Sequence, residues 1–342
     1  MRVAAFTGGR TISSARFRVR QYIDEMRQHD IDMIEYLAPL GSWPPANHAI
    51  RPAWALATLA TRLPAIAASY RCDLTFLQRE MLSTFRTLEP LTKAPRVLDL
   101  DDAVWMSRES QLRKLVEGVD GVVCGNAFID DWAGQWNANR IILPTSVDTN
   151  RWHPRPEPTE GDGATSRPRI IGWTGLYAGS KYLLSTEHAL VRVLQQHPDV
   201  TLRVVSDRRP DFCFVPPDRV EYIPWSPENE VSTMQDMTVG IMPLHDTPWE
   251  RGKCSYKMLL YMACGLPVVV SPVGMNREVL ELGEAGLAAH DSDEWVTALT
   301  GLLDDPACAR RMGTMGRSVI VNHFALRVLA IQLARYFRSF NG

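Results

Sequence analysis

The residues with the clearest chemical potential lie between two short apolar runs, 239–244 and 268–270, which read as buried parallel strands. The polar loop after the first run carries the charged residues Glu250, Arg251 and Lys253. Ser255 follows this loop and is placed to cap a helix. A helix N-terminus at the carboxyl ends of parallel strands attracts phosphate, and the cations just before it could reach the same group. The pattern therefore predicts a phosphate site.

The end of this segment also carries a family resemblance. Residues 262–269 read Met-Ala-Cys-Gly-Leu-Pro-Val-Val, and Ser-Pro-Val-Gly follows at 271–274. This stretch resembles the donor-site segment of retaining glycosyltransferases of the GT-B fold, specifically family 4 (group 1). The resemblance covers nearly the whole chain and implies an α/β protein of two Rossmann-like domains that face a central cleft. It also implies that the segment holds the nucleoside and diphosphate of an activated sugar, with Pro272 and Gly274 among the donor-binding residues.

The length of 342 residues suits two domains, each able to bury its own core. We expect an N-terminal acceptor-side domain at 1–153 and a linker rich in Pro, Gly and acidic residues at 154–168. A donor domain at 169–324 follows, and the resemblance implies that a last helix, 325–342, packs back on the first domain. The formal net charge of −2 gives no overall attraction for nucleic acid.

Compartment signals favour a cytoplasmic protein. The six cysteines are scattered without the short paired spacing of zinc sites, so we expect reduced thiols. The chain goes directly into a strand, which leaves too short an N-terminus for a signal peptide. No apolar run approaches the length of a membrane span. We expect no metal either, since the resembling family does not require one.

The first strand, 2–7, ends in the tight turn Gly8-Gly9, where the backbone could approach a ligand closely. Both glycines are candidates for donor binding, although no third glycine completes a dinucleotide fingerprint. The acceptor is expected against the same domain, near this turn.

Three arginines, Arg16, Arg18 and Arg20, begin the next helix, which Ser14 is expected to cap. Cations at a helix N-terminus oppose the helix dipole unless an anion lies nearby. Arg16 or Arg18 is therefore expected to face the acceptor or sugar, with a solvated basic face as the alternative.

A strand that begins near Arg96 runs into three acidic residues, the last two of which form the pair Asp101-Asp102. Acids at the carboxyl end of a strand lie where open α/β sheets bind ligands. Many family 4 enzymes have a histidine close to the donor sugar in the equivalent loop, so the pair is a departure. We favour hydroxyl binding to donor or acceptor, and pairing with Arg16 or Arg18 is an alternative of equal weight.

The segment 53–70 predicts an Ala/Leu-rich helix, broken at Pro64 and nearly free of charge. Such a helix could touch a membrane or a lipid-linked acceptor. It lacks the basic face of interfacial helices, so a buried packing helix is the favoured interpretation. Peripheral contact with the inner face of the membrane is kept as the alternative.

The second domain begins with a strand at 169–174 that ends in Gly175. In the resembling family an arginine follows this glycine, and a lysine stands six residues after it; both contact the donor diphosphate. Lys181 falls at the lysine position, whereas Leu176 stands at the arginine position. Arg251 or Lys253 could replace the missing cation.

A further departure concerns two glutamates that family 4 carries seven residues apart, one near the sugar and one on the ribose. Their positions here are Gly252 and Leu260. Glu250 is close enough to serve the first role if the loop is reshaped. Glu278 is a distant candidate for the second.

These features together predict a retaining, metal-independent glycosyltransferase that uses a nucleotide-sugar donor, UDP or GDP being the expected nucleotides. The acceptor could be a glycan, a lipid-linked glycan or a small molecule. Lys181, Arg251, Lys253 and the helix at Ser255 would stabilise charge on the leaving diphosphate. A non-catalytic partner subunit of the same fold and a sugar-nucleotide epimerase are the alternatives.

Overall fold

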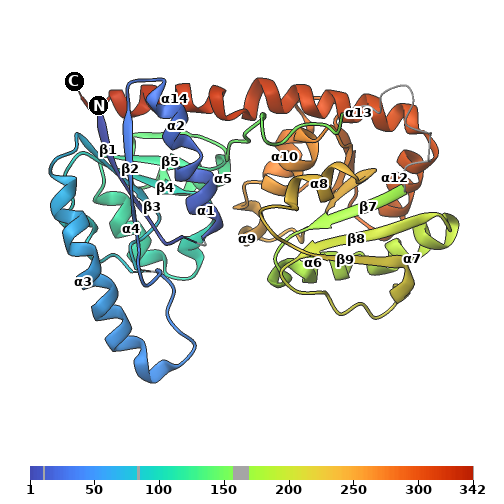
Figure 1. The fold of residues 1–342 in the computed structure, drawn as a ribbon, viewed down its shortest axis with the longest axis horizontal. Helices are drawn as coiled ribbons and strands as arrows, with labels where there is room; N and C mark the ends of the chain where they lie inside the picture. The colour runs from blue at the N-terminus through green and yellow to red at the C-terminus, as the bar shows by residue number, and fades with distance from the viewer. Residues whose placement is uncertain (11, 83–84, 157–168, 342) are drawn as a thin grey trace. The chain divides into compact units, whose positions relative to one another are not determined.

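The computed structural model describes residues 1–10, 12–82, 85–156 and 169–341. They form two compact units, each with its own sheet (Figure 1). The first unit comprises Met1–Ser146, Arg251–Cys254 and Ala325–Gly342, and the second comprises Val147–Glu250 and Ser255–Phe324. Most of the expected linker, residues 157–168, lies outside the described residues.

The first unit is built on a parallel six-stranded sheet of order β2-β1-β3-β4-β5-β6. Nearly every residue of the central strands is buried, because helices cover both faces of such a sheet. The strands are β1 (Arg2–Thr7), β2 (Asp32–Leu37), β3 (Leu74–Gln78), β4 (Arg96–Leu100), β5 (Gly121–Cys124) and β6 (Arg140–Ile142).

The helices of the first unit lie around this sheet, and the last of them comes from the C-terminus of the chain. They are α1 (Ser13–Ala15), α2 (Tyr22–Arg27), α3 (Arg51–Ser69), α4 (Glu109–Glu117), α5 (Ala127–Ala133) and α14 (Leu326–Arg338). Apolar side chains of α2 and α14 share one core cluster with β1, β3 and β4. Tyr336 of α14 also accepts a hydrogen bond from the backbone N–H of Val122 in β5, at 3.0 Å. The terminal helix is therefore part of the first unit.

The second unit carries a parallel sheet of order β12-β11-β10-β7-β8-β9. Counted within the unit this is the 3-2-1-4-5-6 order of Rossmann folds, which reverses between β7 and β10. The strands are β7 (Arg169–Thr174), β8 (Val200–Ser206), β9 (Val220–Pro224), β10 (Val239–Met242), β11 (Val268–Val270) and β12 (Gly286–Ala288).

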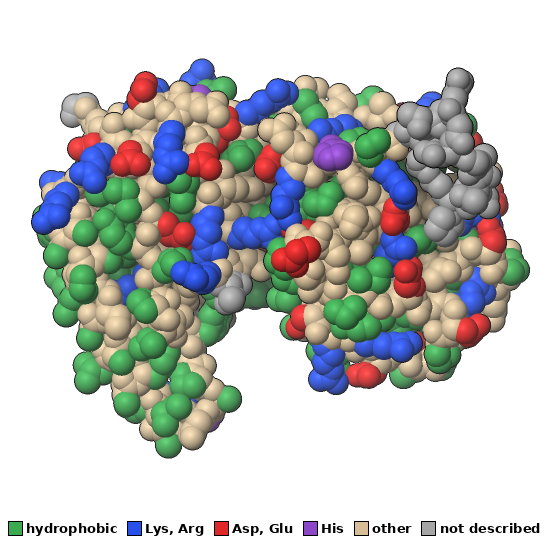
Figure 2. Space-filling model, viewed as in Figure 1, with side chains coloured by type: hydrophobic (Ala, Val, Ile, Leu, Met, Phe, Trp, Pro, Cys, Tyr) green, Lys and Arg blue, Asp and Glu red, His purple; other side chains and the backbone are tan. Residues whose placement is uncertain are grey.

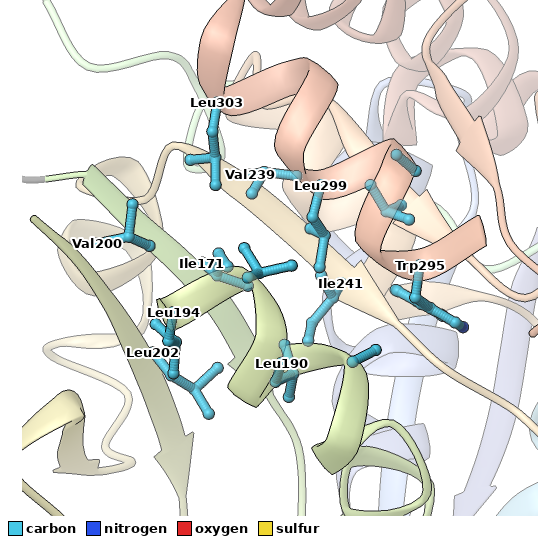
Figure 3. Packing of buried hydrophobic residues seen from close by; sticks show 14 of the residues in the cluster. Ile171, Leu190, Leu194, Val200, Leu202, Val239, Ile241, Trp295, Leu299 and Leu303 are labelled. Carbon is cyan, nitrogen blue, oxygen red and sulfur yellow. The ribbon is translucent and has the colours of Figure 1, made fainter. Parts of the chain in front are cut away.

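Helices cover this second sheet as well. They are α6 (Ser180–Ser185), α7 (Glu187–Gln196), α8 (Glu230–Gln235), α9 (Pro248–Arg251), α10 (Tyr256–Ala263), α11 (Met275–Leu280), α12 (Ser292–Asp304) and α13 (Pro306–Val319). Figure 3 shows Ile171 and Ile241, from the two central strands, against Leu190 of α7 and Leu299 of α12. Burying these side chains stabilises the unit by about 1.5 to 3 kcal/mol for each one.

The helix predicted after Gly9 forms, but its start and its continuity differ from the prediction. Ser14 does not cap a helix, because Ile12 occupies the N-cap position and Ser14 lies inside the short helix α1. The expected single helix is divided by a π-helical stretch, Arg16–Arg20, before α2 begins. π-helical turns of this kind are frequent at functional sites.

Helix α3 differs from its prediction in two ways. Pro64 does not break the helix, which continues from Arg51 to Ser69, and it buries only one side, through Thr58, Arg62, Ile66 and Ser69. On the other side Leu56 is 73% exposed, and apolar side chains cover this helix in Figure 2. The expectation of a buried packing helix is thus wrong for its outer face. No helix of the described residues is both long and apolar enough to span a membrane.

Candidate active site

The strand order of the second sheet reverses between β7 and β10. The carboxyl edge beside such a reversal is where α/β proteins have their ligand-binding crevice. Helix α10 begins there, since it leads from β10 back to the start of β11. Ser255 occupies its N-cap position with φ 49° and makes no capping hydrogen bond, which corrects the expected cap. The Ser255 hydroxyl is buried and has no hydrogen-bond partner among the described residues. The helix start thus offers polar groups at the crevice.

Glycine lets α10 lie close against the two central strands. A Cβ on Gly240 of β10 would fall 2.3 Å from the ring of Tyr261, so only glycine leaves room for this side chain. The Tyr261 hydroxyl accepts a hydrogen bond of 2.8 Å from the backbone N–H of Thr174, the last residue of β7. Burial raises the pKa of this hydroxyl, so it remains protonated. The contact fixes α10 beside the glycine turn at Gly175.

Lys181 and Glu250 lie near each other in the second unit. Lys181 is exposed, and its ammonium lies 4.8 Å from the ring centroid of Tyr182. Glu250 is buried and accepts hydrogen bonds from the hydroxyls of Tyr182 and Thr247. Burial alone would raise the pKa of Glu250, but these two hydrogen bonds and Lys181 lower it below its ordinary value. The burial favours a structural role for Glu250, in contrast to the expected sugar contact.

The loop Arg251–Cys254 belongs to the first unit. The side-chain amide of Asn126 donates to the carbonyls of Arg251 and Lys253, at 3.3 and 3.0 Å. The Cys254 thiol donates to the carbonyl of Asp101 at 3.1 Å. Gly252 lies so close to Ala103 that a Cβ would be 2.4 Å from the Ala103 Cβ. The glutamate of the family pattern is therefore absent for a steric reason.

We expect Gly252→Glu, which restores the family glutamate, to destabilise the first unit by about 1 to 3 kcal/mol without raising activity, because the new side chain overpacks against Ala103. Urea unfolding with amide exchange in β4 measures the change. Gly301→Ala is the control: its Cβ meets nothing within 4 Å in helix α12, so it should stabilise by roughly 0.5 to 1 kcal/mol. A Gly252→Glu protein as stable as wild type and more active would contradict the steric explanation.

The other donor-side candidates lie on the second unit. Leu260 is buried in α10 with 7% exposure, so its position cannot present a ribose ligand. Gly274 has φ 53° and is the N-cap residue of α11, directly after the loop that contains the buried Pro272. Glu278 is exposed in the first turn of α11, close to the carboxyl end of β11. Gly274 and Glu278 thus both lie at the start of α11, which follows the carboxyl end of β11.

Arg18 does not face a ligand, which corrects one expectation. Its side chain is 1% exposed and forms an ion pair of 2.5 Å with Asp99, whose side chain is fully buried. A second hydrogen-bond partner is the carbonyl of Leu143, at 2.8 Å. Burial alone would lower the pKa of Arg18, but Asp99 raises it above its ordinary value. Arg18 is thus a charged structural residue inside the first unit.

Asp101 and Asp102 pair with neither Arg16 nor Arg18 in the structure. Arg79 binds both carboxylates, through hydrogen bonds of 2.6 Å each, and has the unusual φ of 60°. Burial raises the pKa of Asp102, whereas Arg79 and, more weakly, Lys253 lower it. Lys253 thus lies where its charge acts on the acidic pair. The hydroxyl-binding role of the pair stays a prediction.

The glycine turn of the first unit is covered by protein. A Cβ on Gly8 would fall 2.8 Å from the hydroxyl of Ser42, and Gly9 has φ 141°. The Gly9 carbonyl accepts a hydrogen bond of 2.6 Å from Arg20. Arg16 is half-buried in the π-helical stretch, with its guanidinium 4.8 Å from the ring centroid of Phe17. A ligand role for Gly8, Gly9 and Arg16 stays a prediction.

The sequence of the second unit matches a known family. Residues 168–305 match the family model described as Glycosyl transferases group 1. This part of the chain is thus similar to group 1 glycosyltransferases. The match supports a glycosyltransferase and covers the candidate donor side, including Lys181, Ser255 and Gly274. No curated protein matches the sequence significantly.

Several solved structures have the same fold as this chain, and glycosyltransferases are among them. Sucrose-phosphate synthase from Thermosynechococcus elongatus is 17% identical, with a TM-score of 0.74 over 99% of this chain and 98% of that one. HepE from Anabaena in complex with UDP-glucose is 15% identical, with a TM-score of 0.67 over 99% and 100%. WaaG, a glycosyltransferase of lipopolysaccharide biosynthesis, is 12% identical, with a TM-score of 0.65 over 98% of each chain. The GT-B prediction is confirmed, whereas family 4 and retention stay predictions.

Two polar residues of this glycosyltransferase were overlooked at the sequence level. Arg79 directly follows β3, at the same sheet edge as Asp101 and Asp102. This position at the end of a strand could have marked it in the sequence. Lys257 is the second residue of α10. A cation in the first turn opposes the helix dipole, and this unfavourable placement could have marked the residue in the sequence.

A cavity of about 580 Å³ lies at the opposite edge of the second sheet, beside the starts of β7 and β10. Two of its lining arginines, Arg155 and Arg169, are paired with Asp236 and Asp199. The cavity lies at the amino ends of the strands, so it is separate from the crevice at their carboxyl ends. Among the described residues no three His, Cys, Asp or Glu side chains gather in a metal-like cluster.

Proposed function

We propose that the protein transfers a sugar from a nucleotide-diphosphate sugar to an acceptor hydroxyl, with retention at the anomeric carbon and with UDP as the nucleotide. The observation that carries the proposal is the start of α10 at the strand-order reversal of the second sheet, where the Ser255 hydroxyl has no hydrogen-bond partner in the part of the chain that the structure describes. Backbone N–H groups at a helix start bind phosphate oxygens, and the helix dipole favours their negative charge. UDP is favoured because HepE, of the same fold, has been solved with UDP and with UDP-glucose.

The chemical demand of this reaction is charge on the leaving diphosphate. As the bond to the anomeric carbon lengthens, negative charge grows on the phosphate oxygens, and fixed dipoles and cations there lower the barrier. The helix start at Ser255 and the ammonium of Lys181 would meet that demand. In retaining enzymes of this fold the departing phosphate is thought to take the proton of the acceptor, so no separate protein base is required.

The acceptor side is proposed on the first unit. Asp101 and Asp102 are held by Arg79 at the carboxyl edge of its sheet, with the Asp102 side chain 31% exposed. Carboxylates in this setting accept hydrogen bonds from sugar hydroxyls. A glycan, a lipid-linked glycan or a small molecule would satisfy this chemistry, and the apolar outer face of α3 would suit a lipid-linked acceptor or the membrane surface.

A thermal-shift screen against UDP, GDP, ADP, dTDP and their sugars tests the proposal. A ligand at 100 times its Kd stabilises the folded protein by about 2.7 kcal/mol, so a binder raises Tm clearly. We expect the largest shift with UDP or a UDP-sugar, and in Lys181→Ala a shift with UDP that falls more than the shift with the UDP-sugar. If no nucleotide shifts Tm, the non-catalytic partner subunit becomes the better interpretation.

A further inference from the structure

Asn126, which lies just after β5, uses both ends of its side-chain amide. It is 1% exposed and is the N-cap residue of α5, where its Oδ1 accepts a hydrogen bond of 2.9 Å from the backbone N–H of Ile129. Its Nδ2 donates to the carbonyls of Arg251 and Lys253, at 3.3 and 3.0 Å. Serine or aspartate would cap the helix as well, but neither could donate to two carbonyls at once. The cap alone therefore does not explain an asparagine here, whereas the two carbonyls do.

The loop Arg251–Cys254, which carries these carbonyls, is packed closely onto the first unit. A Cβ on Gly125 would fall 2.3 Å from the sulfur of Cys254, so glycine leaves the space that the sulfur occupies. The thiol is 7% exposed and donates to the carbonyl of Asp101. Residues 252–254 form neither helix nor strand, so the position of their backbone depends on anchors such as the Asn126 amide.

The same loop brings a second cation to the acidic pair. Arg79 holds Asp101 and Asp102 through hydrogen bonds of 2.6 Å each. Burial raises the pKa of Asp102, and the charges of Arg79 and Lys253 act against that effect. Two cations thus act on two carboxylates, which favours the ionised form of both. An ionised carboxylate only accepts hydrogen bonds, which suits the hydroxyl groups of a sugar.

We propose that Asn126 is a positioning residue for the transfer reaction: it holds the loop Arg251–Cys254 against the acidic loop, so that Lys253 stays beside Asp102 and the two carboxylates keep one arrangement toward the acceptor. This inference rests on the proposed function and concerns its acceptor side. Because Asn126 is buried, it acts through the loop and not by contact with a substrate.

Asn126→Asp separates the two roles of this side chain, because aspartate keeps the helix cap but loses both donors. With two hydrogen bonds lost, we expect the loop to detach about 10- to 100-fold more often. Alkylation of Cys254 by iodoacetamide, followed by peptide mass spectrometry, measures this change. Burial raises the pKa of the Cys254 thiol and shields it while the loop is in place, so labelling reports detachment. Asn126→Ser, which caps without adding a charge, should behave likewise.

Turnover is measured as UDP release from the UDP-sugar and the hydroxyl acceptor that the wild type uses fastest. A displacement of about 1 Å costs up to about 10²-fold in rate, so the kcat of Asn126→Asp should fall about 10- to 100-fold. The Kd of UDP should change much less, because UDP is proposed to bind at Ser255 and Lys181 of the second unit. Labelling of Cys124, which is fully buried in β5, reports the folded fraction of the first unit and should not change.

The matched control is Asn137→Asp, at the amino edge of the same sheet. The Asn137 side chain donates to the carbonyls of Val116 and Val119, at 3.0 and 2.9 Å. It also accepts a hydrogen bond of 2.9 Å from the backbone N–H of Asn139. The substitution therefore removes the same two kinds of bond away from the loop, and it should change neither the labelling of Cys254 nor turnover.

Four results would overturn the inference. Unchanged labelling of Cys254 in both Asn126 variants would reduce Asn126 to a helix cap. Faster labelling with unchanged turnover would show that the position of the loop does not serve the reaction, and the proposed function would stand. If the labelling of Cys124 rose together with that of Cys254, Asn126 would be a structural residue of the whole unit. If the wild type used no UDP-sugar, the proposed function would fail and the inference with it, whereas the labelling would still show how the loop is held.

Discussion

Replacing Arg18 by methionine is expected to destabilise the first unit by about 3 to 5 kcal/mol, because it leaves the Asp99 carboxylate buried without its countercharge. Burial raises the pKa of Asp99, and Arg18 opposes that effect. Without the arginine, the folded-state pKa rises further above the unfolded value. The penalty is full above the folded pKa and is released as the pH falls toward the unfolded one. The deficit of Arg18→Met should therefore shrink in acid.

Amide exchange in β1, β3 and β4 is the suitable measurement, because a two-unit protein need not unfold in one step. Arg27→Met is the matched control: Arg27 pairs with Asp24 in the same region, but both side chains are exposed, and such pairs contribute about 0 to 1 kcal/mol. A double variant with Asp99→Leu should recover part of the loss. If Arg18→Met kept its stability and lost activity, Arg18 would return to the ligand-facing role that the sequence predicted.

Arg18 also shows where sequence reasoning reaches its limit. Three arginines at 16, 18 and 20 read alike along the chain, yet the structure gives each a different neighbour. Asp99 lies 81 residues from Arg18, and only the packing of the π-helical stretch and α2 on β4 brings the pair together. Glu35, from β2, binds Arg20 at 2.8 Å. Partners this far apart in the chain leave no local pattern, so the sequence cannot separate structural from functional arginines.

The strands, by contrast, were predictable. β1 has the bounds expected for it, because a strand buried on both faces needs a continuous apolar run. Gly265 ends α10 with φ 72°, as expected of a glycine at a helix stop. Gly252 was noted only as a departure from a family pattern. Its reason, the close approach to Ala103, is a contact between distant segments that no spacing reveals.

Lys181→Ala is expected to lower turnover about 10²- to 10³-fold, the range found when one stabilising group for a developing oxyanion is removed. Stability should change little, because Lys181 is exposed and its contact with the Tyr182 ring contributes at most about 1 kcal/mol. Initial rates with UDP-sugars and an accepted hydroxyl compound, together with urea unfolding, measure the two effects. Lys114→Ala, an exposed lysine in α4, should change neither.

The division of the loss between kcat and KM carries the mechanistic meaning. Interactions that strengthen only as charge develops on the leaving diphosphate raise kcat, whereas uniform binding of the donor lowers only KM. We expect Lys181→Ala to act chiefly on kcat and to weaken the binding of UDP, the charged product, more than that of the intact donor. Loss of fold in proportion to loss of activity would instead assign Lys181 to the support of Tyr182 and Glu250, and the cation at the leaving group would have to be another residue.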